Sequence, residues 1–420
     1  MDFFVFLILT ACNAQEAQNI NCEEEGKVVA TVTAVPSEGA KPTGADDTSK
    51  PTATPNPTAA PMPKPTATPE PKIVTLTISA AGDVTLGNTH LQGYDGTFRK
   101  EYDVQQNPGY FFEKVRPILE ADDMTIVNFE GVLTLSNERV EKAFNLKGDP
   151  EYIDILTEGS VEAVSFGNNH RMDYGQQGSD DTVAMFEKAG IAYAYDEFVG
   201  TYEVNGLTVG FVSVNEHYDG IAVEAFLEDG IKQLQHKEVD LIIACCHWGV
   251  ETHHYIDDVQ GELGRKCIDW GADLVLGHHP HVLQGIEKYN DRYIVYSLGN
   301  FCFGGNKNPK NKETMIFQKT FTFVDGEVQL DDNIQIIPCY ISSVKKRNNF
   351  QPIPAEGEEA KKIIDHINQY SKVTVYAARR FNESVIISVF KIIDNFFNFE
   401  ISVTIFFFKM LFSCVGCNVF

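Results

Sequence analysis

Three histidine side chains lie within a stretch of four residues at the end of a short apolar run. Residues 273–276 are long enough for one buried strand, and Gly277 separates them from His278, His279 and His281. On an extended backbone, side chains two residues apart point to the same side, so we expect His279 and His281 to converge and His278 to face away. Neutral imidazole binds divalent transition metals. The alternative for this stretch alone is a histidine-rich turn that holds no metal.

Four other strand-like runs also end at side chains that can bind a metal. Residues 73–81, 124–127, 161–166 and 240–246 lead respectively to Asp83, Glu130, the pair Asn169 and His170, and His247. In open α/β sheets, sites lie beyond the carboxyl ends of the strands, so we expect these side chains to meet. Their types suit a hard-to-borderline divalent metal. The alternative for Asp83, Glu130 and His247 is hydrogen bonding within loop turns.

Strand-like and helix-like segments alternate from residue 73 onward. Hairpins are expected at Asn205–Gly206 and Asp325–Gly326, because such dipeptides between apolar runs favour tight turns. Helical periodicity predicts helices over residues 110–121, 150–158, 178–189, 222–237, 259–270 and 355–369. This alternation predicts an α/β fold with one mixed sheet or two sheets.

The N-terminal region has the composition of an anchor followed by a spacer. Residues 3–11 are apolar, too short to span a bilayer, and lead to Cys12 in a sequence that looks like a bacterial lipobox. We expect residues 1–12 to be a lipoprotein-type signal segment and residues 13–72, rich in Pro and Thr, to be a disordered spacer. This layout predicts a body tethered by lipid to the extracellular face of a bacterial membrane. The alternative is a chance apolar N-terminus.

The C-terminal region changes character after the body. Residues 346–380 are expected to form a helical extension, and residues 381–420 are rich in phenylalanine and poor in charge. We interpret residues 381–420 as an anomalous tail that arises from a disrupted reading frame or a misplaced gene end. A membrane segment is the alternative.

The charge of the chain excludes some partners. With 34 Lys and Arg against 59 Asp and Glu, the net charge is −25. This value argues against a nucleic-acid partner. An anionic polymer would also be repelled overall, unless a local basic patch or a metal supplied the attraction.

Six motifs in order resemble the CapA family of capsule and poly-γ-glutamate synthesis proteins, which are similar to calcineurin-like metallophosphoesterases. They are Ala80-Ala-Gly-Asp-Val-Thr-Leu-Gly87, Asn128-Phe-Glu-Gly131, Gly167-Asn-Asn-His-Arg-Met-Asp-Tyr-Gly175, Cys246-His-Trp-Gly-Val-Glu251, Gly277-His-His-Pro-His-Val282 and Tyr296-Ser-Leu-Gly-Asn-Phe301. The resemblance implies an α-β-β-α sandwich with mixed sheets over residues 73–345 and a metal site at the strand ends. It also implies a role in the synthesis or export of an anionic polymer, with that polymer or its membrane-bound synthesis subunits as partners.

The resemblance also assigns roles to individual residues. Asp83 and His170 are the implied catalytic residues, with His170 as an acid or a transition-state stabiliser. The metal, which we expect to be Mn, Fe or Zn, would be held by the residues that match the family's ligands: Asp83, Glu130, Asn169, His247, His279 and His281.

Two positions depart from the metallophosphoesterase pattern. Thr85 stands where that pattern has a histidine, and Arg171 stands where it has an acidic residue. We expect structural roles for Asp173, Glu251 and Asn300, the first and last through loop hydrogen bonds. Three functions therefore remain open: a CapA-like protein of polymer synthesis, a metal-dependent hydrolase of phosphoesters or related bonds, and a binding module whose metal site has decayed.

Overall fold

The structure is a computed structural model that describes residues 70–219 and 222–377. The expected signal segment with Cys12, nearly all of the expected spacer and the apolar tail after residue 380 lie outside the described residues.

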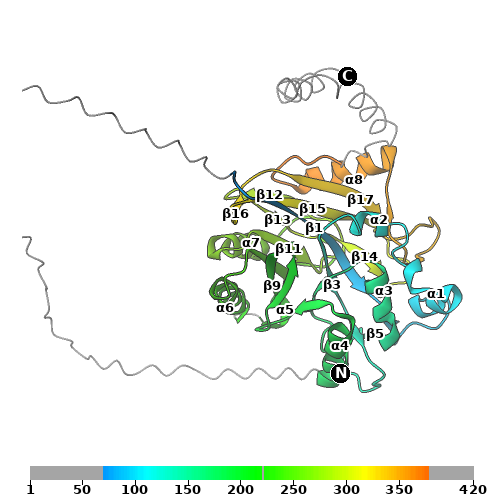
Figure 1. The fold of residues 1–420 in the computed structure, drawn as a ribbon. Helices are drawn as coiled ribbons and strands as arrows, with labels where there is room; N and C mark the ends of the chain where they lie inside the picture. The colour runs from blue at the N-terminus through cyan, green and yellow to red at the C-terminus, as the bar shows by residue number, and fades with distance from the viewer. Residues whose placement is uncertain (1–69, 220–221, 378–420) are drawn as a thin grey trace, which may run out of the picture. The chain divides into compact units, whose positions relative to one another are not determined.

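A large mixed sheet forms one half of the core (Figure 1). Its central strands β1, β3, β6 and β7 run parallel, whereas β15 pairs with β1 in the antiparallel sense. Its strands are β18 (Ile353–Pro354), β17 (Ile334–Tyr340), β15 (Glu313–Val324), β1 (Ile73–Thr85), β3 (Met124–Phe129), β6 (Ala163–Ser165) and β7 (Ala192–Ala194), with β14 (Asn300–Phe303) beside β1 and β16 (Glu327–Gln329) beside β15.

A second mixed sheet packs against the first, and a small third sheet follows the ends of β1 and β3. In the second sheet, β9, β10, β11 and β13 run parallel. In order its strands are β12 (Ile286–Tyr289), β13 (Arg292–Val295), β11 (Leu274–His278), β10 (Leu241–His247), β9 (Leu207–Asn215) and β8 (Gly200–Val204). The third sheet consists of β2 (Asn88–Thr89), β5 (Leu146–Gly148) and β4 (Val132–Leu133).

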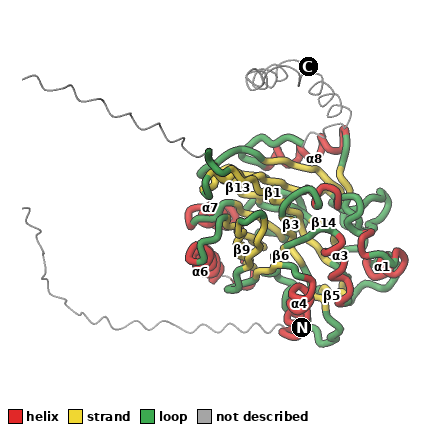
Figure 2. The backbone as a smooth tube through the Cα atoms, viewed as in Figure 1, coloured by secondary structure: helices red, strands yellow, loops and turns green. Residues whose placement is uncertain are grey.

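Helices flank the two large sheets (Figure 2). They are α1 (Phe98–Gln105), α2 (Arg116–Leu119), α3 (Asp154–Glu158), α4 (Gly175–Ala189), α5 (Glu216–Asp219), α6 (Val223–His236), α7 (Asp258–Trp270) and α8 (Gly357–Tyr370), with 3₁₀ turns at Pro108–Tyr110 and Pro150–Ile153. Between residues 70 and 377, apart from the gap at 220–221, no helix combines the length and apolar character needed to cross a bilayer.

The alternation of side chains along the strands builds a four-layer sandwich. In β10, Ile243 and Cys245 face the large sheet, where they join Ile78 of β1 in one apolar core. The intervening residues of β10, such as Ala244, pack with α6 and α7 in a second core. A third core joins the outer face of β3 and β6 to helices such as α4. The order of layers is helix, sheet, sheet, helix (Figure 1), so the expected α/β sandwich with mixed sheets is confirmed.

The expected continuous helix over residues 110–121 is wrong. The chain instead forms a 3₁₀ turn that ends at Tyr110, a series of turns, and the four-residue helix α2. Pro117 explains the break, because proline lacks an N–H to donate to the preceding turn and disfavours helical geometry in the residue before it. Proline is tolerated in the first turn, so the helix begins again at Arg116.

A close backbone approach aligns the ends of β1 and β14. A Cβ atom on Gly82 would lie 1.8 Å from the carbonyl oxygen of Gly299, so only glycine fits at this position. The N–H of Asp83 then donates to that same oxygen at 2.9 Å. The contact brings Asp83 beside Asn300, the first residue of β14.

Candidate metal centre

The carboxylate of Glu130 lies at the centre of a group of histidines. Glu130 follows β3 directly, and its N–H donates to the carbonyl of Val84 at 2.8 Å. Its side chain is fully buried, and neither carboxylate oxygen has a hydrogen-bond partner. The Nε2 atoms of His170, His247 and His281 each lie 3.8 Å from Glu130 Oε1. We call Asp83, Glu130, Asn169, His170, His247, His279 and His281 the histidine–carboxylate cluster.

His247, Asn169 and His279 meet on one side of this cluster. They come from the end of β10, the loop after β6 and the turn after β11. His247 Nε2 lies 3.2 Å from Asn169 Oδ1 and 3.0 Å from His279 Nδ1. The fold therefore joins three side chains that the sequence separates by as much as 110 positions, 169 to 279.

Asp83 and His281 meet on the other side. His281 Nδ1 lies 3.1 Å from Asp83 Oδ2 and 3.0 Å from Asn300 Oδ1. Because both partners offer oxygen acceptors, Nδ1 donates to them, and Nε2 on the other side of the ring faces Glu130. Asn128 Nδ2 donates to Asp83 Oδ1 at 2.8 Å and fixes the carboxylate from behind.

His170 is held by a separate buried carboxylate. Its Nδ1 lies 2.7 Å from Asp173 Oδ2, and Asp173 also accepts from Lys142 Nζ at 2.8 Å and from the N–H of Leu146. A carboxylate with these donors is an acceptor for the His170 Nδ1 proton, so the Nε2 lone pair points toward Glu130. These contacts give Asp173 the structural role that we expected for it.

His279 and His281 converge as expected, but the expected extended backbone and the outward direction of His278 are wrong. β11 ends at His278, and the chain then turns through positive φ angles of 95° at His279 and 57° at His281, so the backbone is not extended. His278 does not face away, because its Nδ1 lies 3.4 Å from Asp83 Oδ1 and is buried without any other partner. Residues forced into this region cost about 1–3 kcal/mol each and concentrate at functional sites.

The electrostatics of the cluster separate charged from neutral groups. Burial opposes ionisation of Asp83, but its contacts with His278 and His281 prevail and hold its pKa well below the ordinary value. Burial disfavours a charged His281, yet the charge of Glu130 and the hydrogen bond to Asp83 raise its pKa to about 10, so a metal that binds Nε2 would displace a proton from it. Burial lowers the pKa of His279 to about 3 and holds that of His247 well below its ordinary value. His247 and His279 are therefore neutral, the form that binds metals.

Glu130 is likewise shifted, in the opposite direction to Asp83. Burial raises the pKa of Glu130 to about 8; the charge of Asp83 adds to the rise and His281 opposes it. A buried carboxylate without a hydrogen-bond partner is costly, and a bound cation is one way in which proteins compensate for it.

The donor set fits a divalent cation. Three overlapping groups each place one ligand atom per residue within 4.8 Å of one another: Glu130, His247 and His279; Asp83, Glu130 and His281; and Glu251, His279 and His281. Nitrogen and oxygen ligands bind Zn²⁺ at about 2.0–2.2 Å, so two ligands of one ion lie no more than about 4.4 Å apart. The 3.8 Å separations around Glu130 Oε1 meet this limit. Glu251, for which we expected only a structural role, belongs to one of these groups.

The two departures from the metallophosphoesterase pattern have structural contacts of their own. Thr85 Oγ1 donates to the carbonyl of Glu130 at 2.8 Å and so braces the loop that carries the central carboxylate. Arg171 pairs with Asp196, donates to Ser179 Oγ at 3.2 Å and lies over the ring of Tyr195.

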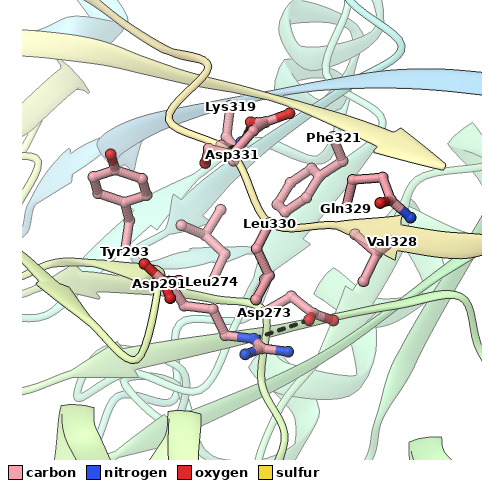
Figure 3. A pocket seen from close by; sticks show the side chains of 11 residues that line it. Asp273, Leu274, Asp291, Tyr293, Lys319, Phe321, Val328, Gln329, Leu330 and Asp331 are labelled. Atoms are coloured by element: carbon pink, nitrogen blue, oxygen red, sulfur yellow. Dashed lines mark hydrogen bonds and ion pairs between the residues drawn. The ribbon is translucent and has the colours of Figure 1, made fainter.

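A small cavity elsewhere, between β11 and β13 of the second sheet and β15 and β16 of the first, contains no histidine (Figure 3). It is lined by residues such as Leu274 and Arg292, at the beginning of β11 and β13, whereas the cluster lies beyond the end of β11. Its volume of about 10 Å³ is enough for roughly one water molecule. The ion pair between Arg292 and Asp273 closes one side of it.

The motifs of the cluster coincide with a known family. Residues 77–305 match the description "Bacterial capsule synthesis protein PGA_cap", a range that includes all seven residues of the cluster. This chain belongs to the PGA_cap family. The resemblance to CapA proteins, with their calcineurin-like phosphoesterase type of fold, is thereby confirmed.

Curated relatives of this PGA_cap protein come from several bacteria. "PGA biosynthesis protein CapA" of Bacillus subtilis is 32% identical over 54% of this chain and 63% of that protein. "Capsule biosynthesis protein CapA" of Bacillus anthracis is 29% identical over 54% of this chain and 60% of that protein. A "Probable polyglutamine synthesis accessory protein" of Mycobacterium tuberculosis is 23% identical over 54% and 68%. The match spans less than two thirds of the two Bacillus proteins.

Proposed function

We propose that this protein acts in the synthesis or export of an anionic capsule polymer of the poly-γ-glutamate type, through a body that binds a divalent metal. Membership of the PGA_cap family supports a role with this polymer, and the names of the Bacillus relatives agree with that role. The observation that carries the metal is the Glu130 carboxylate, which is fully buried, lacks a hydrogen-bond partner and faces three imidazoles at 3.8 Å.

The residues at the proposed site have two kinds of role, to hold the ion and to orient the residues that hold it. Asp83, Glu130, Asn169, His247, His279 and His281 would hold the ion. Asn128 and Asn300 orient Asp83 and His281, and Asp173 holds the Nδ1 proton of His170. When bound, a divalent ion supplies Lewis acidity and lowers the pKa of a coordinated water. The identity of the metal, among Mn, Fe and Zn, belongs to this proposal.

We also propose that the protein lies on the outer face of the bacterial membrane. The apolar run before Cys12 and the Pro- and Thr-rich residues 36–72 support a lipid anchor with a spacer. Membrane-bound subunits that synthesise the polymer would then be partners.

Gene deletion tests the proposal. We expect the bacterium that carries this gene to lose surface polymer on deletion, as measured by immunoblotting of washed cells and medium. Wild-type protein should restore the polymer, whereas the His247→Ala and His281→Ala double variant should not. Normal surface polymer in the deletion strain would contradict the proposed role.

A second candidate is a metal-dependent phosphoester hydrolase, which the position of His170 favours. Its Nε2 lies 3.8 Å from Glu130 Oε1 while Asp173 fixes its other nitrogen, so it can hold or donate a proton at the cluster. Turnover of a generic aryl phosphodiester by the Mn²⁺-loaded protein, lost in His170→Gln, would support this candidate. If the wild type retains no metal under any loading condition, a binding module with a decayed site becomes the better account.

A further inference from the structure

A cavity of about 260 Å³ next to the histidine–carboxylate cluster collects positive charge. Arg99, Arg139 and Lys147 line it, against the single carboxylate of Asp149. This concentration stands out in a chain whose net charge is −25. Within the part of the chain that the structure describes, neither Arg99 nor Arg139 forms an ion pair or donates a hydrogen bond. Both guanidinium groups are therefore available to an anion.

Lys147 adds a third cation, which forms no ion pair with a described residue. Its ammonium donates to the carbonyl of Ser136 at 2.7 Å and to Asn137 Oδ1 at 3.2 Å, and it lies 5.0 Å from the ring centre of Tyr174. Both hydrogen-bond acceptors are neutral, and an ammonium group has three donors. His90 also lines the cavity, and its Nδ1 is buried without a hydrogen-bond partner.

Short segments connect this cavity to the cluster. Tyr174, in the cavity wall, is four residues from His170, which limits their Cα separation to about 14 Å. Lys147 follows Leu146, whose N–H donates to the same Asp173 carboxylate that orients His170. The cavity and the cluster are therefore linked through Asp173.

The loop that carries Arg139 makes the second connection. Lys142, three residues further on, donates to the carbonyl of Asn169 at 2.8 Å and to Asp173 Oδ1 at 2.8 Å. The N–H of Val140, next to Arg139, donates to the carbonyl of Asp173 at 3.0 Å. The loop that carries Arg139 is thus fixed to the residue that orients His170.

We propose that this cavity is a subsite that binds carboxylate groups of an extended acidic polymer, a proposal that rests on the proposed function. Guanidinium groups bind carboxylates through paired, charge-assisted hydrogen bonds, and Arg99 and Arg139 have theirs free. The general repulsion between a protein of charge −25 and a polyanion makes such a local attraction necessary for binding. One carboxylate in the cavity would leave a neighbouring part of the same polymer chain beside His170.

Binding of fluorescently labelled poly-γ-glutamate to the full-length, metal-loaded protein tests the subsite. In fluorescence anisotropy, Arg99→Gln with Arg139→Gln should weaken binding at least tenfold. The matched control, Lys188→Gln with Lys346→Gln, removes the same two charges from exposed positions outside the cavity and should change binding less than twofold. Metal content and melting temperature should stay at wild-type values in both variants, because none of the four residues belongs to the cluster.

The outcomes separate the subsite from the proposed function. Equal binding by the cavity variant and the wild type would overturn the proposal of a subsite. The proposed role in polymer synthesis or export would still be tested by the deletion phenotype. Equal weakening by both variants would show that only overall charge matters, and would also overturn it. A parallel titration with polyphosphate distinguishes the ligand class: preference for polyphosphate over poly-γ-glutamate would rule out the carboxylate polymer as the ligand.

Discussion

Glu130 Oε1 and His281 Nε2 lie 3.8 Å apart beyond the ends of β3 and β11, too far for a hydrogen bond and close enough to share one metal ion. His281 has its other nitrogen committed to Asp83 and Asn300, and Glu130 has no other partner. Two strand ends from different sheets thus present unsatisfied atoms to the same point.

His278 should matter for metal binding, contrary to what the alternation of an extended chain suggests. Its Nδ1 lies 3.4 Å from Asp83 Oδ1 and is buried. Loss of a residue that orients a ligand typically weakens metal affinity about 10–100-fold, so we expect that range for His278→Ala. Competition with a fluorescent chelator measures it, with His253→Ala, at an exposed position, as the control. Wild-type affinity in His278→Ala would show that its contact with Asp83 is incidental.

Asp173 should contribute to stability as well as to the orientation of His170. It accepts from His170 Nδ1, Lys142 Nζ and the N–H of Leu146 in a fully buried position. In Asp173→Asn the amide group cannot accept from all three, so we expect a loss of about 1–3 kcal/mol in the free energy of unfolding, measured by urea denaturation. Asp180→Asn, on the exposed face of α4, should stay within about 0.5 kcal/mol of wild type. Equal stability of the two variants would refute the bracing role.

Asp122 should make the protein less stable at alkaline pH. Burial, with added repulsion from Glu162 and Asp123, raises the pKa of Asp122 to about 7 against the hydrogen bonds of Ser79 and Thr125. Because the folded state holds this proton more tightly than the unfolded state, its stabilising effect is complete below about pH 3.8 and is lost as the pH rises through about 7. Asp122→Asn should therefore raise the melting temperature at pH 8 and change it little at pH 4.

The increase in melting temperature expected for Asp122→Asn at pH 8 is a few degrees. A gain of 1 kcal/mol raises the melting temperature by roughly 2–4 °C in a domain of 150–250 residues, and we expect an increase of this order at pH 8. Asp95→Asn removes the same charge from an exposed position and should give no such pH-dependent difference. A melting-temperature difference for Asp122→Asn that is the same at pH 4 and pH 8 would contradict the buried-carboxylate account.

That the side chains of the cluster come together could be predicted from the sequence, because the five strand-like runs are apolar and each leads to a residue that can bind a metal. Parallel strands bring their carboxyl ends to one edge of a sheet, which aligns Asp83 and Glu130 at the ends of β1 and β3. His247 reaches them from β10 of the second sheet through the packing of the two sheets. The hairpin at Asn205 and Gly206 was predictable for a similar local reason, and both residues have positive φ.

Other features depend on geometry that the sequence does not encode locally. The positive φ at His279 changes the direction of the chain after β11 and so the positions of the His279 and His281 rings, and a histidine at this position does not signal such a turn. Lys142 reaches Asp173 across 31 residues of chain, so no spacing rule would join them. Pro117 was visible, but the apolar period of residues 110–121 outweighed it in the prediction of a helix.

Metal content tests the central claim most directly. After loading of the purified full-length chain with Mn²⁺, Fe²⁺ or Zn²⁺ and removal of free ions by gel filtration, elemental analysis should find bound metal in the wild type. The His247→Ala and His281→Ala double variant should lose it, while His236→Ala with His253→Ala, which removes two exposed imidazoles, should retain it. A wild type that retains none of the three ions after loading would contradict the account. So would an equal loss of bound metal in the two double variants.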